Sequence, residues 1–205
     1  MTINATGSWD AWQRQAQINI DDGTTSVDVE AVTETCELDV GERSFDMLTL
    51  LNLGQIPKFG PIGITTLTLE VYPLQAGTAA AGTATGVWDI FASKPAVDAS
   101  GEMDVDLSNT LTRYRVAILL TNDDDATGAE EEIDSGDLAL RFVMADCFCV
   151  SCKSSFTDGI FKQTLVMKGI AFRKDGTSNI KMESCTASDT LTALGTYTPG
   201  GTRWA

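Results

Sequence analysis

Strict alternation of polar and apolar residues is the feature that most restricts the fold of this chain. It runs through residues 26–30 (SVDVE), 67–71 (LTLEV) and 103–107 (MDVDL). Because successive side chains of a strand point to opposite faces, a period of two predicts antiparallel strands with one face in water. Further strands are predicted at 16–20, 45–51, 87–92, 112–121, 138–150, 160–172 and 179–183.

Asp-Gly pairs separate several of the predicted strands, and this dipeptide is favoured in tight hairpins. Asp158-Gly159 predicts a long hairpin formed by residues 142–150 and 160–172. Helical signals are few: a segment 8–17 with Ser8 as its cap, and a segment 189–194 capped by Ser188. The predicted fold class is therefore all-β, mainly an antiparallel sandwich or barrel with one or two short helices.

The pattern predicts a single β domain over residues 1–205. Extended loops are expected at about 52–63, where Pro and Gly gather, and at about 75–86, a run of Ala, Gly and Thr. Residues 122–137 hold eight acids and no base, so a solvated loop is expected there. Residues 196–205 are predicted to be a flexible C-terminal arm.

The composition argues against an enzyme. The chain has no histidine, so neither a Ser-His-Asp nor a Cys-His catalytic unit can form. No phosphate loop, dinucleotide fingerprint or nucleophile elbow is present. Lys and Arg total 14 against 29 Asp and Glu, a formal net charge of −15. Tight binding of nucleic acid needs a cationic surface, so a nucleic-acid-binding role is not expected either. No cofactor is predicted.

The chain shows no signal for export or for insertion into a membrane. Its N-terminus lacks the basic and apolar regions of a secretory signal. The purest apolar run, Val116–Leu120, is far shorter than the ~18 residues that a spanning helix needs. We therefore expect synthesis in a host cytoplasm and no membrane insertion by this chain.

Three of the five cysteines, Cys147, Cys149 and Cys152, cluster in DCFCVSCK. The Cys149–Cys152 spacing is compatible with a redox pair or a thiolate metal site. A closed zinc site needs four ligands, however, and free cysteines are often buried. We favour buried thiols on a strand, so no disulfide framework is predicted.

The acidic segment loosely follows the register of an EF-hand loop. Asp123, Asp125 and Asp134 fall at ligand positions, but Glu130 stands where an apolar residue belongs. An exposed acidic loop is the favoured interpretation. These three residues are weak cation candidates, and no metal site is predicted.

Charge is unevenly distributed along the chain. Residues 1–42 contain nine acids and one base, whereas residues 153–183 contain six bases and three acids. Regions of opposite sign favour head-to-tail contact between copies, or else neutralise each other within one subunit. Exposed sheet edges are templates for pairing with another chain, and a symmetric assembly can consume them by closing a barrel.

Five segments of the C-terminal half form a recognisable series: TRYRVAILLTN (112–122), LRFVMADC (140–147), SSFTDGIFKQTL (154–165), AFRKDG (171–176) and NIKME (179–183). Together they resemble the C-terminal portion of major tail tube proteins of tailed phages and archaeal viruses. The resemblance covers about residues 112–184. No catalytic signature accompanies it.

This resemblance implies a β-sandwich or barrel subunit with one flanking helix. Six copies would form a ring, and stacked rings would form a virion tail tube, a channel for viral DNA that is not specifically bound. Partners would be further copies and other tail proteins. Inter-subunit candidates are Lys58, Phe59, Lys162, Lys168 and Trp204.

An acidic lining would repel DNA phosphates and so prevent them from binding to the wall of such a channel. The lining candidates are Asp28, Glu30, Asp104 and Asp106. Life in strong brine, as for a halophilic virus, would explain the acidity equally well. Two other functions stay open: a capsid decoration or other β-rich virion shell protein, and, less favoured because Trp9, Trp12, Trp88 and Trp204 are scattered, a carbohydrate-binding module.

Overall fold

The computed structural model describes residues 16–24, 26–28, 31–50, 54–73, 112–121, 126, 128–173, 175–185 and 188–201. Within these ranges the chain is all-β, as the alternation predicts, with no helix. The strands are β1 (Gln17–Asp21), β2 (Ser26–Asp28), β3 (Ala31–Asp39), β4 (Arg43–Thr49), β5 (Gln55–Ile62), β6 (Ile64–Pro73), β7 (Tyr114–Thr121), β8 (Ala139–Thr157), β9 (Ile160–Ile170) and β10 (Ile180–Cys185).

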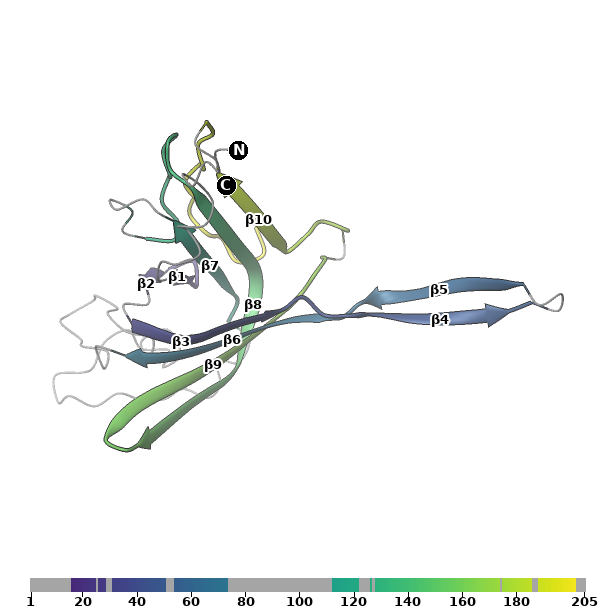
Figure 1. Cartoon of the computed structure of the whole chain (residues 1–205), viewed down its shortest axis with the longest axis horizontal. Helices are drawn as coiled ribbons and strands as arrows, with labels where there is room; N and C mark the ends of the chain where they lie inside the picture. Colours follow the sequence, from purple (N-terminus) through teal and green to yellow (C-terminus); the bar gives the residue numbers. More distant parts are fainter. Residues whose placement is uncertain are drawn as a thin grey trace, which may run out of the picture.

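The main sheet is antiparallel and curls on itself (Figure 1). Its order is β2-β1-β7-β8-β9-β6-β3, and β10 also pairs with β8. The first half of β8 lies between β7 and β10, and the second half pairs with β9. One long strand therefore belongs to two half-sheets, which we call the β7 half-sheet (β2-β1-β7-β8-β10) and the β9 half-sheet (β8-β9-β6-β3).

The bend in β8 lies at Asp146, whose φ of 49° is in the left-handed region. Partners change on either side of this residue: Met144 pairs with Ile180 of β10, and Cys147 pairs with Gly169 of β9. Apolar side chains from β1, β6, β7, β8 and β9 form one buried cluster between the half-sheets. The predicted hairpin and its turn are present, with Asp158 and Gly159 both at positive φ. Its first strand is misplaced, because residues 147–157 rather than 142–150 pair with β9, and residues 139–144 pair with β7 and β10.

Two irregular segments cover the outer face of the β7 half-sheet. Residues 128–137 and 188–201 bury Ala129, Ile133 and Leu191 against Ala117, Leu119 and Val143. Ile133 and Leu191 exchange two backbone hydrogen bonds of 2.9 Å. The expectation of a fully solvated acidic loop is thus wrong for Ala129 and Ile133. The predicted helix at 189–194 is also wrong, because this segment is extended and pairs with its neighbour instead.

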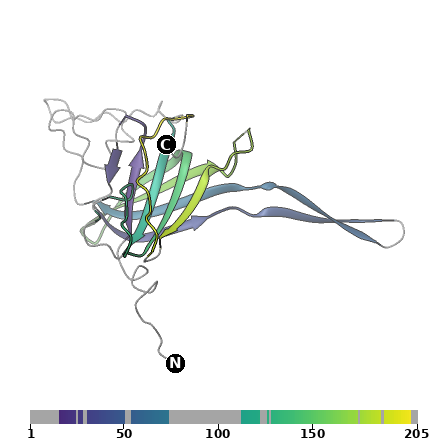
Figure 2. The same ribbon diagram turned by 90° about the horizontal axis from the view of Figure 1, so that it is seen from above.

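Strands β4 and β5 form a separate two-stranded ribbon that projects far from the body (Figures 1 and 2). We call it the arm. The extended loop expected at about 52–63 is wrong for residues 55–62, which form β5. Pro57 and Pro61 are tolerated there because each strand of a lone ribbon has a free outer edge, where a missing N–H costs little. The N-terminal segment 8–15 and the segment 75–86 lie outside the described residues.

Candidate functional site

The arm exposes apolar side chains on both of its faces. Phe45 and Phe59 are cross-strand neighbours, 60% exposed each, with ring centroids 5.3 Å apart. On the other face Leu48 lies opposite Ile56, and each is about half exposed. Beyond pairing with each other, β4 and β5 make no substantial contact with the other named strands. Contiguous exposed apolar surface of this kind marks an interaction site.

Lys58 and Phe59, two of the predicted inter-subunit residues, both lie on this arm. Lys58 is exposed and faces Asp46 across the ribbon. The cross-strand pair Asp46–Lys58 thus lies on the same face as Leu48–Ile56. An isolated two-stranded ribbon is only marginally stable in water, so the arm needs a partner layer that the described residues of this chain do not supply.

Among the described strands, the β9 half-sheet has two edges that pair with no further strand. One is β3, which pairs only with β6 among the described strands. The other is β8 beyond the bend, where residues 148–157 pair with β9 on one side. Glu37 and Asp39 are exposed on β3, and Lys153 is exposed on β8. The two edges therefore differ in charge.

Register places these charges on a single polar face of the β9 half-sheet. Glu37 is paired with Thr68, and Lys153 with Thr164, so both side chains share the face opposite the core. In the middle of the face, Glu70 accepts a hydrogen bond from Thr35 (3.1 Å) and pairs with Lys162 (3.0 Å). Lys168, also predicted as an inter-subunit residue, is exposed on the same face.

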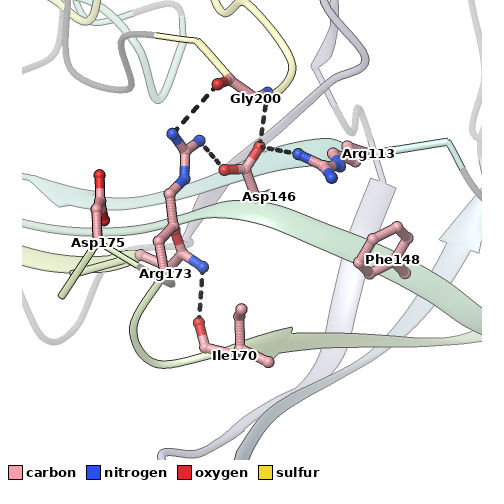
Figure 3. A pocket seen from close by; sticks show the side chains of 8 residues that line it. Arg113, Asp146, Phe148, Ile170, Arg173, Asp175 and Gly200 are labelled. Atoms are coloured by element: carbon pink, nitrogen blue, oxygen red, sulfur yellow. Dashed lines mark hydrogen bonds and ion pairs between the residues drawn. The ribbon is translucent and has the colours of Figure 1, made fainter. Parts of the chain in front are cut away.

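A cavity of about 400 Å³ opens at the bend of β8 (Figure 3). It is lined by Arg113, Asp146, Phe148, Ile170, Arg173, Asp175, Asn179 and Gly200. We call it the corner pocket. It combines charged groups with the apolar side chains of Phe148 and Ile170. Ile170 is 54% exposed, so this wall is open to solvent.

Asp146 anchors the corner pocket and the C-terminal segment. One carboxylate oxygen accepts hydrogen bonds from the Tyr197 hydroxyl and the Gly200 N–H, both at 3.0 Å, and the other pairs with Arg173. Both oxygens are therefore engaged. Arg113 stands 4.0 Å from Oδ1 and its side chain stays 48% exposed. Its guanidinium is thus a positive group at the pocket, and its one ionic contact among the described residues is the long one to Asp146.

A second polar cluster surrounds the buried Arg115 of β7. Its guanidinium bonds Asp21 at 3.1 Å, Glu130 at 3.3 Å and the Gly195 carbonyl at 2.6 Å. Burial raises the pKa of Asp21 and of Glu130, and the lowering effect of Arg115 does not cancel it. Asp28, a predicted lining residue, accepts a hydrogen bond from Asn19 (3.0 Å) beside this cluster.

Arg141 of β8 plays the matching role at the other end of the β7 half-sheet. It donates to Glu183 (2.9 and 3.0 Å) and to the Glu131 carbonyl (3.0 Å). Burial alone would raise the pKa of Glu183, but hydrogen bonds from Lys181 and Arg141 lower it below its ordinary value. Sequence reasoning missed both buried arginines. The available signal was a single charge inside an apolar strand run.

The cysteine cluster lies on β8, as free thiols. Cys147 is buried, and Cys149 and Cys152 are half-buried on the core side. Burial raises the pKa of Cys149 to about 12, which leaves it a weak nucleophile at neutral pH. Within the described ranges no group of three or more His, Cys, Asp or Glu is placed to hold a metal ion.

Several predicted residues lie outside the described part of the chain: Glu30, Asp104, Asp106, Asp123, Asp125 and Trp204. Asp134 is exposed on the covering segment. No helix among the described residues is long and apolar enough to cross a membrane.

No protein-family model matches the sequence. No curated protein matches it either. Among solved structures, the chain is similar to a component of the sheath-tube complex of an extracellular contractile injection system (TM-score 0.43, 12% identity, covering 89% of this chain and 94% of that one). It is also similar to the tube-terminating cap of the anti-feeding prophage (TM-score 0.44, 12% identity, 90% and 95%). A third similar structure is Hcp1 from Flavobacterium johnsoniae (TM-score 0.34, 9% identity, 86% and 100%).

Proposed function

We propose that this chain is a structural protein whose copies join head-to-tail into closed rings that stack into a tube. One observation chiefly supports the proposal: the β9 half-sheet ends in two open edges of different charge. Its four strands alternate in direction, so β3 of one copy and distal β8 of the next, related by rotation, would again be antiparallel. Each ring would then close a continuous antiparallel barrel.

Charge would select this pairing over others. Strand β3 presents Glu37 and Asp39, and distal β8 presents Lys153. A stagger of one pleat, normal in a closing barrel, brings Glu37 level with Lys153 of the next copy. Because the two edges differ, the contact is heterologous, and it builds a ring when the rotation closes.

The resemblance of residues 112–184 extends the proposal to a virion tail. Rings of six copies would form a channel for viral DNA, with other tail proteins at its ends and the arm reaching another copy. The polar face of the β9 half-sheet would line the channel, placing Glu37, Asp39 and Glu70 there. Lys153, Lys162 and Lys168 lie on the same face, so the described acids and bases of this lining balance. Asp28 belongs to the other half-sheet, so these residues replace it as lining candidates in this arrangement. The lining roles of Glu30, Asp104 and Asp106 stay predictions.

Negative-stain microscopy and sedimentation of purified protein test the ring. We expect annular particles or short hollow cylinders. Lys153→Glu should weaken association, and adding Glu37→Lys to it should restore association. The matched control is Lys168→Glu, which makes the same charge change at an exposed position on the same face, but on the inner strand β9 rather than at an edge. A strict monomer at high concentration and in native salt would refute the proposed function.

A further inference from the structure

Resting on the proposed function, we propose that the corner pocket is the receptor for the arm of a second copy of this chain. The face of the arm that carries Asp46, Leu48, Ile56 and Lys58 would enter the pocket. Its carboxylate would pair with Arg113, and its two apolar side chains would cover Phe148 and Ile170.

The arm cannot serve its own chain in this way. It leaves the body at Asp39 and Ile64 and points away from it in both views (Figures 1 and 2). The corner pocket lies on the body, where the start of β7, the bend of β8 and the end of β9 meet. Its apolar wall, Phe148 and Ile170, projects from the end of the polar face, so the pocket would lie at the rim of the proposed channel. The occupant therefore has to be a different molecule.

Two kinds of surface match between arm and pocket. The arm offers one acid and one base opposite each other, Asp46 and Lys58, with an apolar pair one rung further along. The pocket offers one half-exposed base, Arg113, one exposed acid, Asp175, and an apolar wall. With Asp46 toward Arg113, the antiparallel partner Lys58 falls toward the acidic side of the pocket.

The charges of the pocket allow it to bind a carboxylate, because Arg113 can pair with one. Asp146 already accepts hydrogen bonds on both of its oxygens, and Arg173 neutralises its charge. Arg113 keeps 48% of its side chain exposed at 4.0 Å from Asp146. A carboxylate at hydrogen-bond distance from this guanidinium would form the stronger pair, and the apolar cover would exclude water from it.

Burial of exposed apolar side chains would provide a driving force for binding of the second copy. Leu48 is 50% and Ile56 49% exposed on the arm, and Ile170 is 54% exposed in the pocket. Each of these side chains loses water when the surfaces meet. An anchor of apolar residues rimmed by complementary charges is the usual anatomy of a protein interface.

Disulfide cross-linking tests proximity directly in the assembled protein. The variant carrying Leu48→Cys and Ile170→Cys, treated with a mild oxidant, should give inter-chain dimers and higher ladders on a non-reducing gel. The matched control carries Leu48→Cys and Met182→Cys; Met182 is 64% exposed on β10 and does not line the pocket. The unsubstituted chain, which has five cysteines, sets the background. Ladders of equal intensity in test and control would overturn the assignment.

An arm charge swap tests specificity. Asp46→Lys combined with Lys58→Asp keeps both the net charge and the cross-strand pair, so the arm should fold as before. It reverses the polarity presented to the pocket, and we expect association between copies to weaken by about tenfold or more. Mixing this variant with a pocket variant, Arg113→Asp with Asp175→Arg, should recover the association. Circular dichroism confirms the fold of each variant.

The outcomes separate the two proposals. If the unsubstituted chain forms no assembly, the proposed function fails. If it assembles and the arm swap associates as tightly as the unsubstituted chain, the ring proposal stands and the receptor assignment is wrong. If only the pocket variant weakens association, the pocket holds another segment, and the arm is excluded as its occupant.

Discussion

Replacing Asp146 with asparagine tests whether the bend of β8 depends on charge or on backbone shape. Asparagine tolerates the left-handed φ of 49° at this position nearly as well as aspartate does. Its carbonyl oxygen can still accept from Tyr197 and Gly200. Its amide nitrogen, however, would face the N–H groups of Arg173, so that one ion pair is lost.

The size of the effect follows from the burial of the pair. Removing one partner of a buried ion pair costs about 3–5 kcal/mol. Asp146 is buried but Arg173 is 20% exposed, so water compensates part of the loss. We expect Asp146→Asn to lower the free energy of unfolding by about 2 kcal/mol. Asp146→Ala loses all three partners and adds about 1 kcal/mol of left-handed strain, so about 4 kcal/mol is expected.

Urea unfolding followed by circular dichroism measures both values. With a slope of about 2 kcal/mol per molar urea, the asparagine variant should shift the midpoint by about 1 M. Measurements at two protein concentrations separate folding from association. If the asparagine variant matched the unsubstituted chain within about 0.5 kcal/mol, the role of the charge would be refuted. If alanine were no worse than asparagine, the role of the Tyr197 and Gly200 hydrogen bonds and of the left-handed backbone would be refuted.

Two further predictions concern the ion pair of Glu183 with Arg141 and the contact between Gly23 and Pro199. Because the pKa of Glu183 is lowered in the fold, its stabilising contribution is present above its ordinary pKa of 4.5 and is lost as pH falls through the folded pKa. The stability gap between the unsubstituted chain and Glu183→Gln should therefore shrink between about pH 6 and pH 3 in urea titrations; a constant gap would contradict this. Gly23→Ala should cost more than Gly159→Ala in the same assay. Both glycines have positive φ, but only at Gly23 would the new Cβ meet Pro199, at 2.5 Å, whereas Gly159 has open space. Equal costs would show that the contact with Pro199 yields.

Local signals carried the sequence predictions that succeeded. The alternation and the Asp158-Gly159 turn sufficed for the β8–β9 hairpin, because both depend on residues close in sequence. Strands β3 and β5 were missed for different reasons. In β3 a bulge between Thr33 and Thr35 breaks the period of two. In β5 the two prolines indicated a loop. They are compatible with a strand here because each strand of the ribbon has a free outer edge, where no backbone N–H is needed.

The polar anchors could not be predicted because they depend on contacts distant in sequence. Arg115 meets Asp21 and the Gly195 carbonyl, and Asp146 meets Gly200, across long stretches of chain. A strand pattern shows that a charge is out of place but not which segment will satisfy it. The same holds for the helix expected at 189–194, where pairing with Ile133 prevailed over a local capping signal.

If copies assemble as proposed, the exposed arm has a consequence for each single copy before assembly. A single copy has exposed phenylalanines on the arm and two open strand edges among its described strands. Both features also favour non-specific aggregation. Its surplus of negative charge makes copies repel one another at a distance, and dissolved salt shortens the range of that repulsion to about 8 Å at physiological strength. Correct assembly should therefore be most efficient at an intermediate ionic strength. At low ionic strength, charge repulsion keeps the subunits apart. At high ionic strength, exposed apolar surfaces can associate before the matching surfaces have aligned.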